Sequence, residues 1–145
     1  MLTVNLKDGL QIKLQARFIR NDRPIWDDRI NEVHPHFKVT VWAKGNKHTF
    51  DFWDSVDAYC HGKTELEDWA LLDALACFIN DAAAYDANRN YADFCAAFGY
   101  REEEDAMYAK PIFRECRKAF EHYMYTFGQD WTIGEQIDEL ISNYN

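Results

Sequence analysis

Histidine and cysteine side chains that could bind a metal ion gather in one stretch of the sequence. His34, His36 and His48 precede the adjacent pair Cys60 and His61. Strands can bring such distant residues together, but neither spacing matches a known zinc-ligand pattern. The interpretation as surface-loop histidines is favoured, so we expect no metal and no cofactor. A metal-dependent enzyme that uses this region stays an alternative.

The sequence contains no motif of a known catalytic centre. It has no Gly-x-Ser-x-Gly, no phosphate-binding glycine loop, no His-Glu-x-x-His and no paired cysteine framework. Asp51 with Asp54, or Asp57 with Glu65, could in principle form a general acid and base. Such pairs occur by chance among 25 acidic residues, and no pattern indicates a pocket that would raise one pKa. We therefore expect that the chain is not an enzyme.

The acidic residues favour a binding function. Sixteen basic and 25 acidic residues give a formal charge of −9 and a pI near 4.9. Such a surface repels nucleic acid and anionic membranes and attracts basic surfaces. Rows of carboxylates can imitate the phosphates of a nucleic acid, although a solvated face that only maintains solubility has the same pattern. The candidate partner-binding acids are Asp51, Asp54, Asp57, Glu65, Glu67, Asp68, Glu102, Glu103, Glu104 and Asp105.

Aromatic residues are numerous, with ten Phe, eight Tyr and five Trp. Large rings fill a core, and Tyr and Trp also anchor interfaces. Trp26 lies in a long loop that carries charges of both signs, where it could contact a partner or fold over the sheet as a lid. Trp42 and Trp53 have the opposite alternation phase to their apolar neighbours, which predicts a less buried face. Trp26, Trp42 and Trp53 are the candidate aromatic anchors.

The elements that position these residues begin with strands. Leu2, Val4 and Leu6 alternate with polar residues, and the alternation resumes from Leu10 to Phe18 after Asp8-Gly9. Asp-Gly between two alternating runs predicts a hairpin, because both central turn residues need positive φ. A second hairpin is expected from alternation over 37–41 and 48–53 around a turn at 43–46. Together they predict an antiparallel sheet of about four strands.

Helical spacing dominates the remainder of the sequence. A Thr-x-x-Glu capping box predicts a helix from about Glu65 to Ala84, and a second such box predicts a short helix after Trp131. Asn90 and Gly99 fit the two ends of a short helix over 91–98. A longer helix is expected to start at the acids 102–105 and to end at Gly128. Pro111 should either kink this helix, which is the favoured interpretation, or mark a restart near Lys110.

Strands followed by helices, without alternation, predict an α+β fold. We expect one domain over 1–145, in which 1–53 form the sheet and 64–145 form three to four helices packed on one of its faces. The cysteines are expected to be reduced core thiols, since no C-x-x-C pair exists. The first residues lack the pattern of a signal peptide, and no apolar run approaches the roughly 20 residues that span a bilayer. We therefore expect a cytoplasmic protein with no membrane partner.

The second half resembles a group of small, mostly uncharacterised proteins encoded by bacteriophages. The resemblance depends on Phe50-Asp51-Phe52, the apolar helix from Leu71 to Asp81, the stretch Phe94-Cys-Ala-Ala-Phe-Gly-Tyr100, and Cys116. It covers roughly residues 37–127, and only the Phe-Cys-x-x-Phe-Gly-Tyr stretch is distinctive. The sequence departs from the group after Tyr100, where an Asp-rich turn is expected. The resemblance implies a phage or mobile-element origin and transfers no catalytic residue.

Small acidic phage proteins without catalytic motifs often bind and block a host complex. We therefore expect an inhibitor of a bacterial defence system, such as an anti-CRISPR protein. Its acidic and aromatic residues would occupy a basic nucleic-acid-binding surface of a protein or ribonucleoprotein, without direct binding of nucleic acid. A non-inhibitory phage accessory or assembly protein is the alternative. The oligomeric state does not follow from the sequence.

Overall fold

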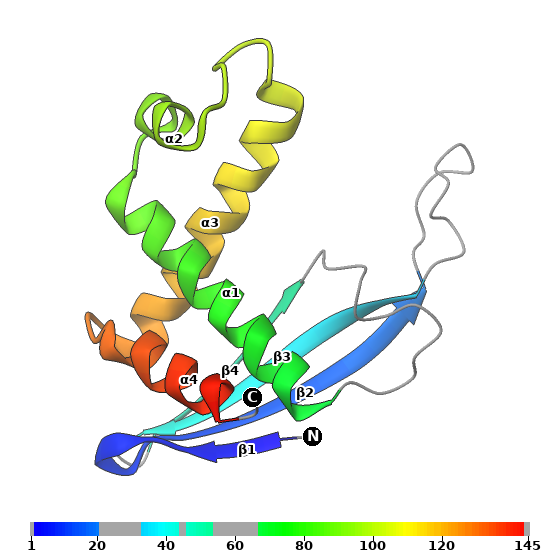
Figure 1. Ribbon diagram of the computed structural model, residues 1–145, viewed down its shortest axis with the longest axis vertical. Helices are drawn as coiled ribbons and strands as arrows, with labels where there is room; N and C mark the ends of the chain where they lie inside the picture. Colours follow the sequence, from blue (N-terminus) through cyan, green and yellow to red (C-terminus); the bar gives the residue numbers. More distant parts are fainter. Residues whose placement is uncertain (1, 21–32, 44–45, 54–66, 144–145) are drawn as a thin grey trace. The chain divides into compact units, whose positions relative to one another are not determined.

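The computed structural model describes residues 2–20, 33–43, 46–53 and 67–143, and gives only the backbone of 16–20, 33–39, 41–43, 46 and 50–53. Figure 1 shows an antiparallel sheet followed by helices. The expected α+β class is therefore confirmed. In chain order the elements are β1 (Leu2–Asn5), a 3-10 turn (Lys7–Gly9), β2 (Gln11–Arg20), β3 (Val33–Ala43), β4 (Asn46–Trp53), α1 (Asp68–Ala87), α2 (Tyr91–Phe98), α3 (Ala106–Phe127) and α4 (Thr132–Ser142).

The first predicted hairpin is confirmed. β1 pairs antiparallel with β2, and the register places Val4 opposite Ile12. Asp8 and Gly9 both have positive φ, 61° and 76°, as a tight hairpin turn requires. Val4, Ile12 and Leu14 are buried, because alternate residues of a strand share one face. The hairpin therefore presents one apolar face to the core.

The backbone of β3 pairs antiparallel with those of β2 and β4, so the strand order is β1-β2-β3-β4. Thr40 and Thr49 face each other across β3 and β4, and their hydroxyls lie 3.3 Å apart in a hydrogen bond. The turn of the predicted second hairpin includes residues 44 and 45, which lie outside the described part of the chain. Trp26 and the expected capping box at 64–67, apart from Glu67, lie outside it as well.

The chain forms two compact units. One comprises Met1–Leu75 with Gln136–Asn145, and the other comprises Ala76–Glu135. In the first unit, the backbone N–H of Lys7 donates to the side-chain oxygen of Gln136 at 3.1 Å. Leu71 and Ile137 are buried in this unit. Because the division falls within α1 and α4, each of these helices contributes residues to both units.

α1 begins and ends three residues later than the sequence predicts. Its last turn is closed by Asn88, whose backbone N–H donates to the carbonyls of Ala84 and Tyr85. The side-chain amide of Asn88 also donates to the Ala84 carbonyl, at 3.3 Å. The ring of Tyr85 packs against Phe113 and Phe120, with centroids 5.5 and 5.2 Å away. This packing extends the helix beyond the predicted apolar stripe.

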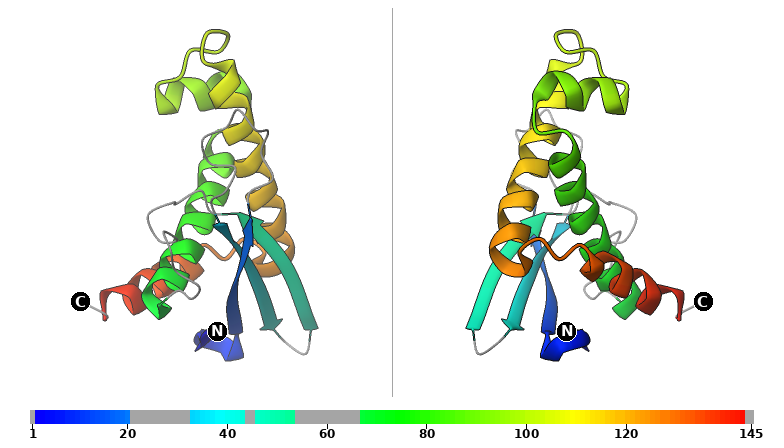
Figure 2. Two further views of the ribbon diagram at one scale, coloured as in Figure 1. Left: turned by 90° about the vertical axis from the view of Figure 1, so that its right-hand side faces the viewer. Right: turned by 90° about the vertical axis from the view of Figure 1, so that its left-hand side faces the viewer.

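Both predicted ends of α2 are confirmed. Asn90 accepts a hydrogen bond from the backbone N–H of Asp93 at 3.1 Å, and Gly99 has φ 76°. Within the second unit, Figures 1 and 2 show α2 lying across the end at which α1 stops and α3 starts. Phe94 is buried there, and its ring centroid lies 5.1 Å from that of Phe113.

α3 is one continuous helix that contains Pro111, so the helix does not restart near Lys110. It begins at Ala106, after the four acids rather than at them, and Gly128 ends it as predicted. The Asp130 carboxylate caps α4 by accepting from the backbone N–H of Thr132 at 3.0 Å. None of the helices that the structure describes is long and apolar enough to cross a membrane.

Candidate functional site

The turn between α2 and α3 carries the densest group of carboxylates in the described part of the chain. Glu102, Glu103 and Glu104 are exposed on it, and we call these three residues the acidic turn. No hydrogen bond or ion pair joins their carboxylates to another residue that the structure describes. Three adjacent negative charges therefore face solvent from one short segment.

The acidic turn is braced on both sides. The Tyr91 hydroxyl donates to the backbone carbonyl of Glu102 at 2.7 Å. The Asp105 carboxylate accepts from the backbone N–H of Arg101 at 2.7 Å, and the backbone N–H of Asp105 donates to the Arg101 carbonyl at 3.1 Å. Tyr100 stacks on Phe94, with planes 15° apart. These contacts already fix the backbone of the acidic turn. Binding of a partner therefore costs little conformational entropy in this segment.

Asp105 differs from the other three acids because its charge is already paired. The Arg101 guanidinium lies 3.3 Å from its carboxylate, and the side-chain and backbone hydrogen bonds from Arg101 lower the pKa of Asp105. The same side-chain hydrogen bond raises the pKa of Arg101. Asp105 therefore holds the turn, whereas the acidic turn itself presents the net charge.

Tyr91, the other brace, also has a perturbed pKa. Desolvation, followed by a hydrogen bond with Cys95 and the charges of Glu102 and Asp105, raises its pKa to about 12. Its hydroxyl is therefore protonated at neutral pH and can donate to the Glu102 carbonyl. The Lys110 ammonium lies 5.9 Å from the centre of the Tyr91 ring.

Large apolar side chains are exposed beside the acidic turn in the sequence. The exposed fractions are 50% for Phe98, 80% for Met107, 67% for Tyr108 and 41% for Ile112. Tyr108 and Ile112 are four residues apart on α3, so they are neighbours on its surface. Aromatic residues and Met are enriched at protein interfaces. We call these four residues the apolar flank of the acidic turn.

The sequence did not single out the apolar flank, although it carried a signal for part of it. Met107 and Tyr108 lie outside the apolar stripe of α3, whose buried members include Cys116 and Tyr123. An aromatic residue off the buried stripe is a candidate for exposure. Phe98 gave no such signal, because it lies four residues after the buried Phe94 and so belongs to the same helix face. It is the last residue of α2, where its ring is half exposed.

The other predicted acids divide into described and undescribed residues. Glu67 and Asp68 are exposed at the start of α1, and the Glu67 carboxylate accepts from the indole N–H of Trp69. Asp51 lies on β4, where only the backbone is described. Asp54, Asp57 and Glu65 lie outside the described residues. Among the predicted acids whose side chains the structure describes, the largest group is that of the α2–α3 turn.

The predicted aromatic anchors stay predictions. Trp42 and Trp53 lie on β3 and β4, but their side chains are outside the described set. Among the described residues, no three His, Cys, Asp or Glu side chains are placed to hold a metal ion. His34 and His36 lie on the backbone-only part of β3, and Cys60 and His61 lie outside the described residues.

The cysteines that the structure describes are free thiols. Cys95 and Cys116 are buried and Cys77 is half-buried. Burial, with smaller contributions from the charges of Asp81 and Glu115, raises the pKa of Cys116 to about 12. This thiol is therefore neutral and a poor nucleophile at physiological pH.

Comparison of the chain with models of known protein families, with curated proteins and with solved structures finds no match.

Proposed function

We propose that this chain is a phage-encoded binding protein that inhibits a host defence complex. It would act as an anti-CRISPR-like protein, occupying a basic nucleic-acid-binding surface with carboxylates and exposed aromatic rings. The proposal includes a cytoplasmic location in the bacterial host, no cofactor, and no direct contact with nucleic acid or membrane. It also includes the finer fold, in which two hairpins form the sheet and the helices pack on one of its faces.

The observation that supports the proposal is the acidic turn with its apolar flank. Three exposed carboxylates on a braced turn resemble a short run of phosphates, and a basic groove attracts both. Charge of this kind accelerates association and selects the partner, whereas apolar anchors supply more of the affinity. Phe98 and Tyr108 are exposed beside the charges in sequence and can supply such anchors.

The test measures inhibition with purified components. Target-DNA binding by a panel of CRISPR effector complexes and restriction enzymes is measured with and without the chain, at low and at high salt. We expect the chain to reduce DNA binding by at least one of these enzymes at low salt. Higher salt should weaken the inhibition, because it screens charges on the protein surface.

A matched pair of variants assigns the effect to the acidic turn. Glu102→Lys, Glu103→Lys and Glu104→Lys together raise the formal charge by six, from −9 to −3. The control reverses three exposed acids elsewhere, Glu115, Asp138 and Glu139, and changes the net charge equally. We expect the first variant to inhibit at least tenfold less well than the control variant.

Tyr108→Ala separates the two parts of the site. It should lower inhibition at high salt as well as at low salt, because an aromatic anchor acts through buried area rather than charge. Equal inhibition by both charge variants would contradict phosphate imitation. If no defence enzyme is inhibited, the proposal is wrong and the accessory-protein alternative is favoured.

A further inference from the structure

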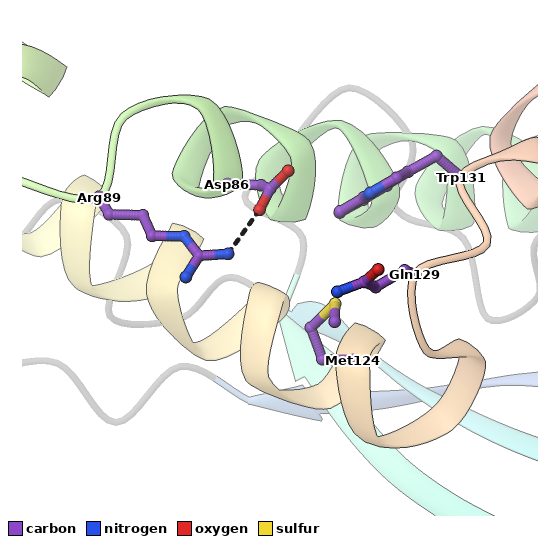
Figure 3. Close-up of a pocket in the computed structure, with 5 residues that line it drawn as sticks. All are labelled: Asp86, Arg89, Met124, Gln129 and Trp131. Atoms are coloured by element: carbon purple, nitrogen blue, oxygen red, sulfur yellow. Dashed lines mark hydrogen bonds and ion pairs between the residues drawn. The ribbon is translucent and has the colours of Figure 1, made fainter.

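The second unit contains a pocket of about 290 Å³ that the acidic turn does not use. Figure 3 shows the five lining side chains, with the Asp86–Arg89 pair at one end and Met124, Gln129 and Trp131 at the other. Ligand pockets for drug-sized molecules measure about 300–1,000 Å³. The volume therefore suits one side chain or a similarly small group.

The Trp131 end of the pocket is held rigidly. The Trp131 indole stacks on the buried Tyr123 ring, with centroids 4.3 Å apart and planes 6° apart. The Tyr123 hydroxyl donates to the backbone carbonyl of Asp130, whose carboxylate caps α4. Because Tyr123 covers one face of the indole, a ligand in the pocket can stack only on the other face.

The charges around the pocket favour a cation. The Arg89 guanidinium lies 2.7 Å from Oδ1 of Asp86 and 4.7 Å from the centre of the Phe120 ring, and the charges of Arg89 and Asp86 compensate each other. The second carboxylate oxygen of Asp86 can still accept a hydrogen bond. Asp86 and Met124 lie in the last turns of α1 and α3, where the helix dipole contributes partial negative charge. Among the described residues that line the pocket, the one cation, Arg89, is already paired, so an anion would find no free positive charge on this lining.

The planar wall favours guanidinium over ammonium. A guanidinium stacks on an aromatic face and donates in its own plane, whereas ammonium is a compact, strongly hydrated charge. Here the plane could lie against Trp131 while its edge donates to Asp86 and to the side-chain oxygen of Gln129. The Met124 thioether adds an adaptable apolar contact for the aliphatic stem.

We propose that this pocket binds an arginine side chain presented by the basic partner. The inference rests on the proposed function, because it takes from it a partner with a basic surface. It adds a second, specific contact to the electrostatic attraction of the acidic turn. The pocket selects one guanidinium group, while the acidic turn responds to the density of positive charge.

The test is a titration of the whole chain with N-acetyl-arginine amide, followed by NMR. We expect saturable shifts of the Trp131 indole N–H and the Gln129 side-chain amide, and at least fivefold weaker binding of N-acetyl-lysine amide. Asp86→Asn keeps the side-chain shape and should weaken arginine binding at least fivefold, whereas Asp138→Asn on α4 should not. Shifts that do not saturate, equal binding of lysine, or an unchanged affinity of Asp86→Asn would each overturn the inference.

The titration can contradict the pocket inference without contradicting the proposed function, and the reverse also holds. If arginine amide does not bind while reversal of the acidic turn abolishes inhibition, only the pocket inference is wrong. If arginine amide binds as expected and no defence enzyme is inhibited, the pocket is a guanidinium site and the proposed function is wrong. Trp131→Leu serves as a second variant, with the NMR spectrum showing whether the chain remains folded.

Discussion

Gly128 determines how the chain leaves α3 and reaches the pocket. Its backbone has φ 67° and ψ −144°, a region that residues with a Cβ rarely adopt. Its N–H donates to the Met124 carbonyl at 3.1 Å, which closes the helix. The following residues then turn back and place Gln129 and Trp131 in the pocket wall. The path of this loop thus depends on one glycine.

We predict that Gly128→Ala lowers the free energy of unfolding by about 2 kcal/mol. Gly99→Ala should cost less, about 1 kcal/mol, because Gly99 has φ 76° and ψ 22°, a left-handed conformation that other residues tolerate better. No atom outside the neighbouring residues lies within 4 Å of a Cβ built at either glycine, so the difference reports backbone strain. Urea denaturation of the two variants measures it, and equal costs would contradict the strain argument.

Because of Cys116, we expect the free energy of unfolding to fall at alkaline pH. The folded chain raises the pKa of this buried thiol from 9.0 to about 12. Between these values the unfolded chain loses the thiol proton while the folded chain keeps it, so the free energy of unfolding falls as pH rises. The slope from one such group is at most about 1.4 kcal/mol per pH unit.

We predict that Cys116→Ala flattens the decline in stability between pH 9 and pH 10. Urea denaturation at several pH values gives the slopes of the variant and the original chain. Cys77→Ala, at a half-buried position, serves as the control. If the two variants have the same slope, Cys116 is not the group that titrates.

At the scale of elements, α3 accommodates Pro111, at which the sequence predicts either a kink or a restart of the helix. Pro111 is the sixth residue of the helix, so its missing N–H would have bonded to the carbonyl of Met107. Met107 is strongly exposed, and water can satisfy its carbonyl. The helix can therefore continue through Pro111 without a restart.

We predict that Pro111→Ala stabilises the chain, by up to about 3 kcal/mol, because alanine restores the helical hydrogen bond and removes the ring clash. Alanine also increases the conformational freedom of the unfolded chain, which offsets part of the gain. Urea denaturation measures the net change in the free energy of unfolding. A loss of stability would mean that the proline ring itself makes favourable contacts in the folded chain.

The elements that the sequence predicted best have local causes. The Asp8-Gly9 hairpin and both ends of α2 depend on residues adjacent in the chain, and the structure confirms them. The C-terminal end of α1 lies beyond the prediction, where Tyr85 packs against Phe113 and Phe120, which are far from it along the chain. Such contacts depend on tertiary structure and leave no periodic signal.

The candidate site could be predicted only in part for the same reason. The acids 102–105 were visible as a run, but their division into three unpaired carboxylates and one paired with Arg101 depends on the fold of the turn. No pattern in the sequence indicated the pocket. Its lining comes from the ends of α1 and α3 and the loop after Gly128, whose meeting no local pattern specifies.

At the scale of the whole molecule, α1 and α4 each contribute residues to both units. Ile137 is fully buried in the first unit, yet it lies on a helix that starts in the second. Ile137→Ala should cost about 2–5 kcal/mol through the lost burial and the cavity that remains. Because α4 contains residues of both units, we expect loss of packing at Ile137 to weaken helical hydrogen bonds in both.

We predict that Ile137→Ala lowers hydrogen-exchange protection in both units, including amides of α3 that lie entirely in the second unit. Exchange measured residue by residue on the variant and the original chain tests this. Glu139→Ala, at an exposed position of α4, is the matched control. A loss of protection confined to the first unit would show that the two units open independently.

The order of the units along the chain has a consequence for synthesis on the ribosome. The second unit is a continuous segment, whereas the first is assembled from residues up to Leu75 and residues from Gln136 onward. Every residue of the second unit is therefore translated before the first unit can be completed. Until Gln136 and Ile137 are synthesised, the first unit lacks part of its buried core, and we expect its remaining apolar residues to be more exposed and more prone to aggregation during that interval.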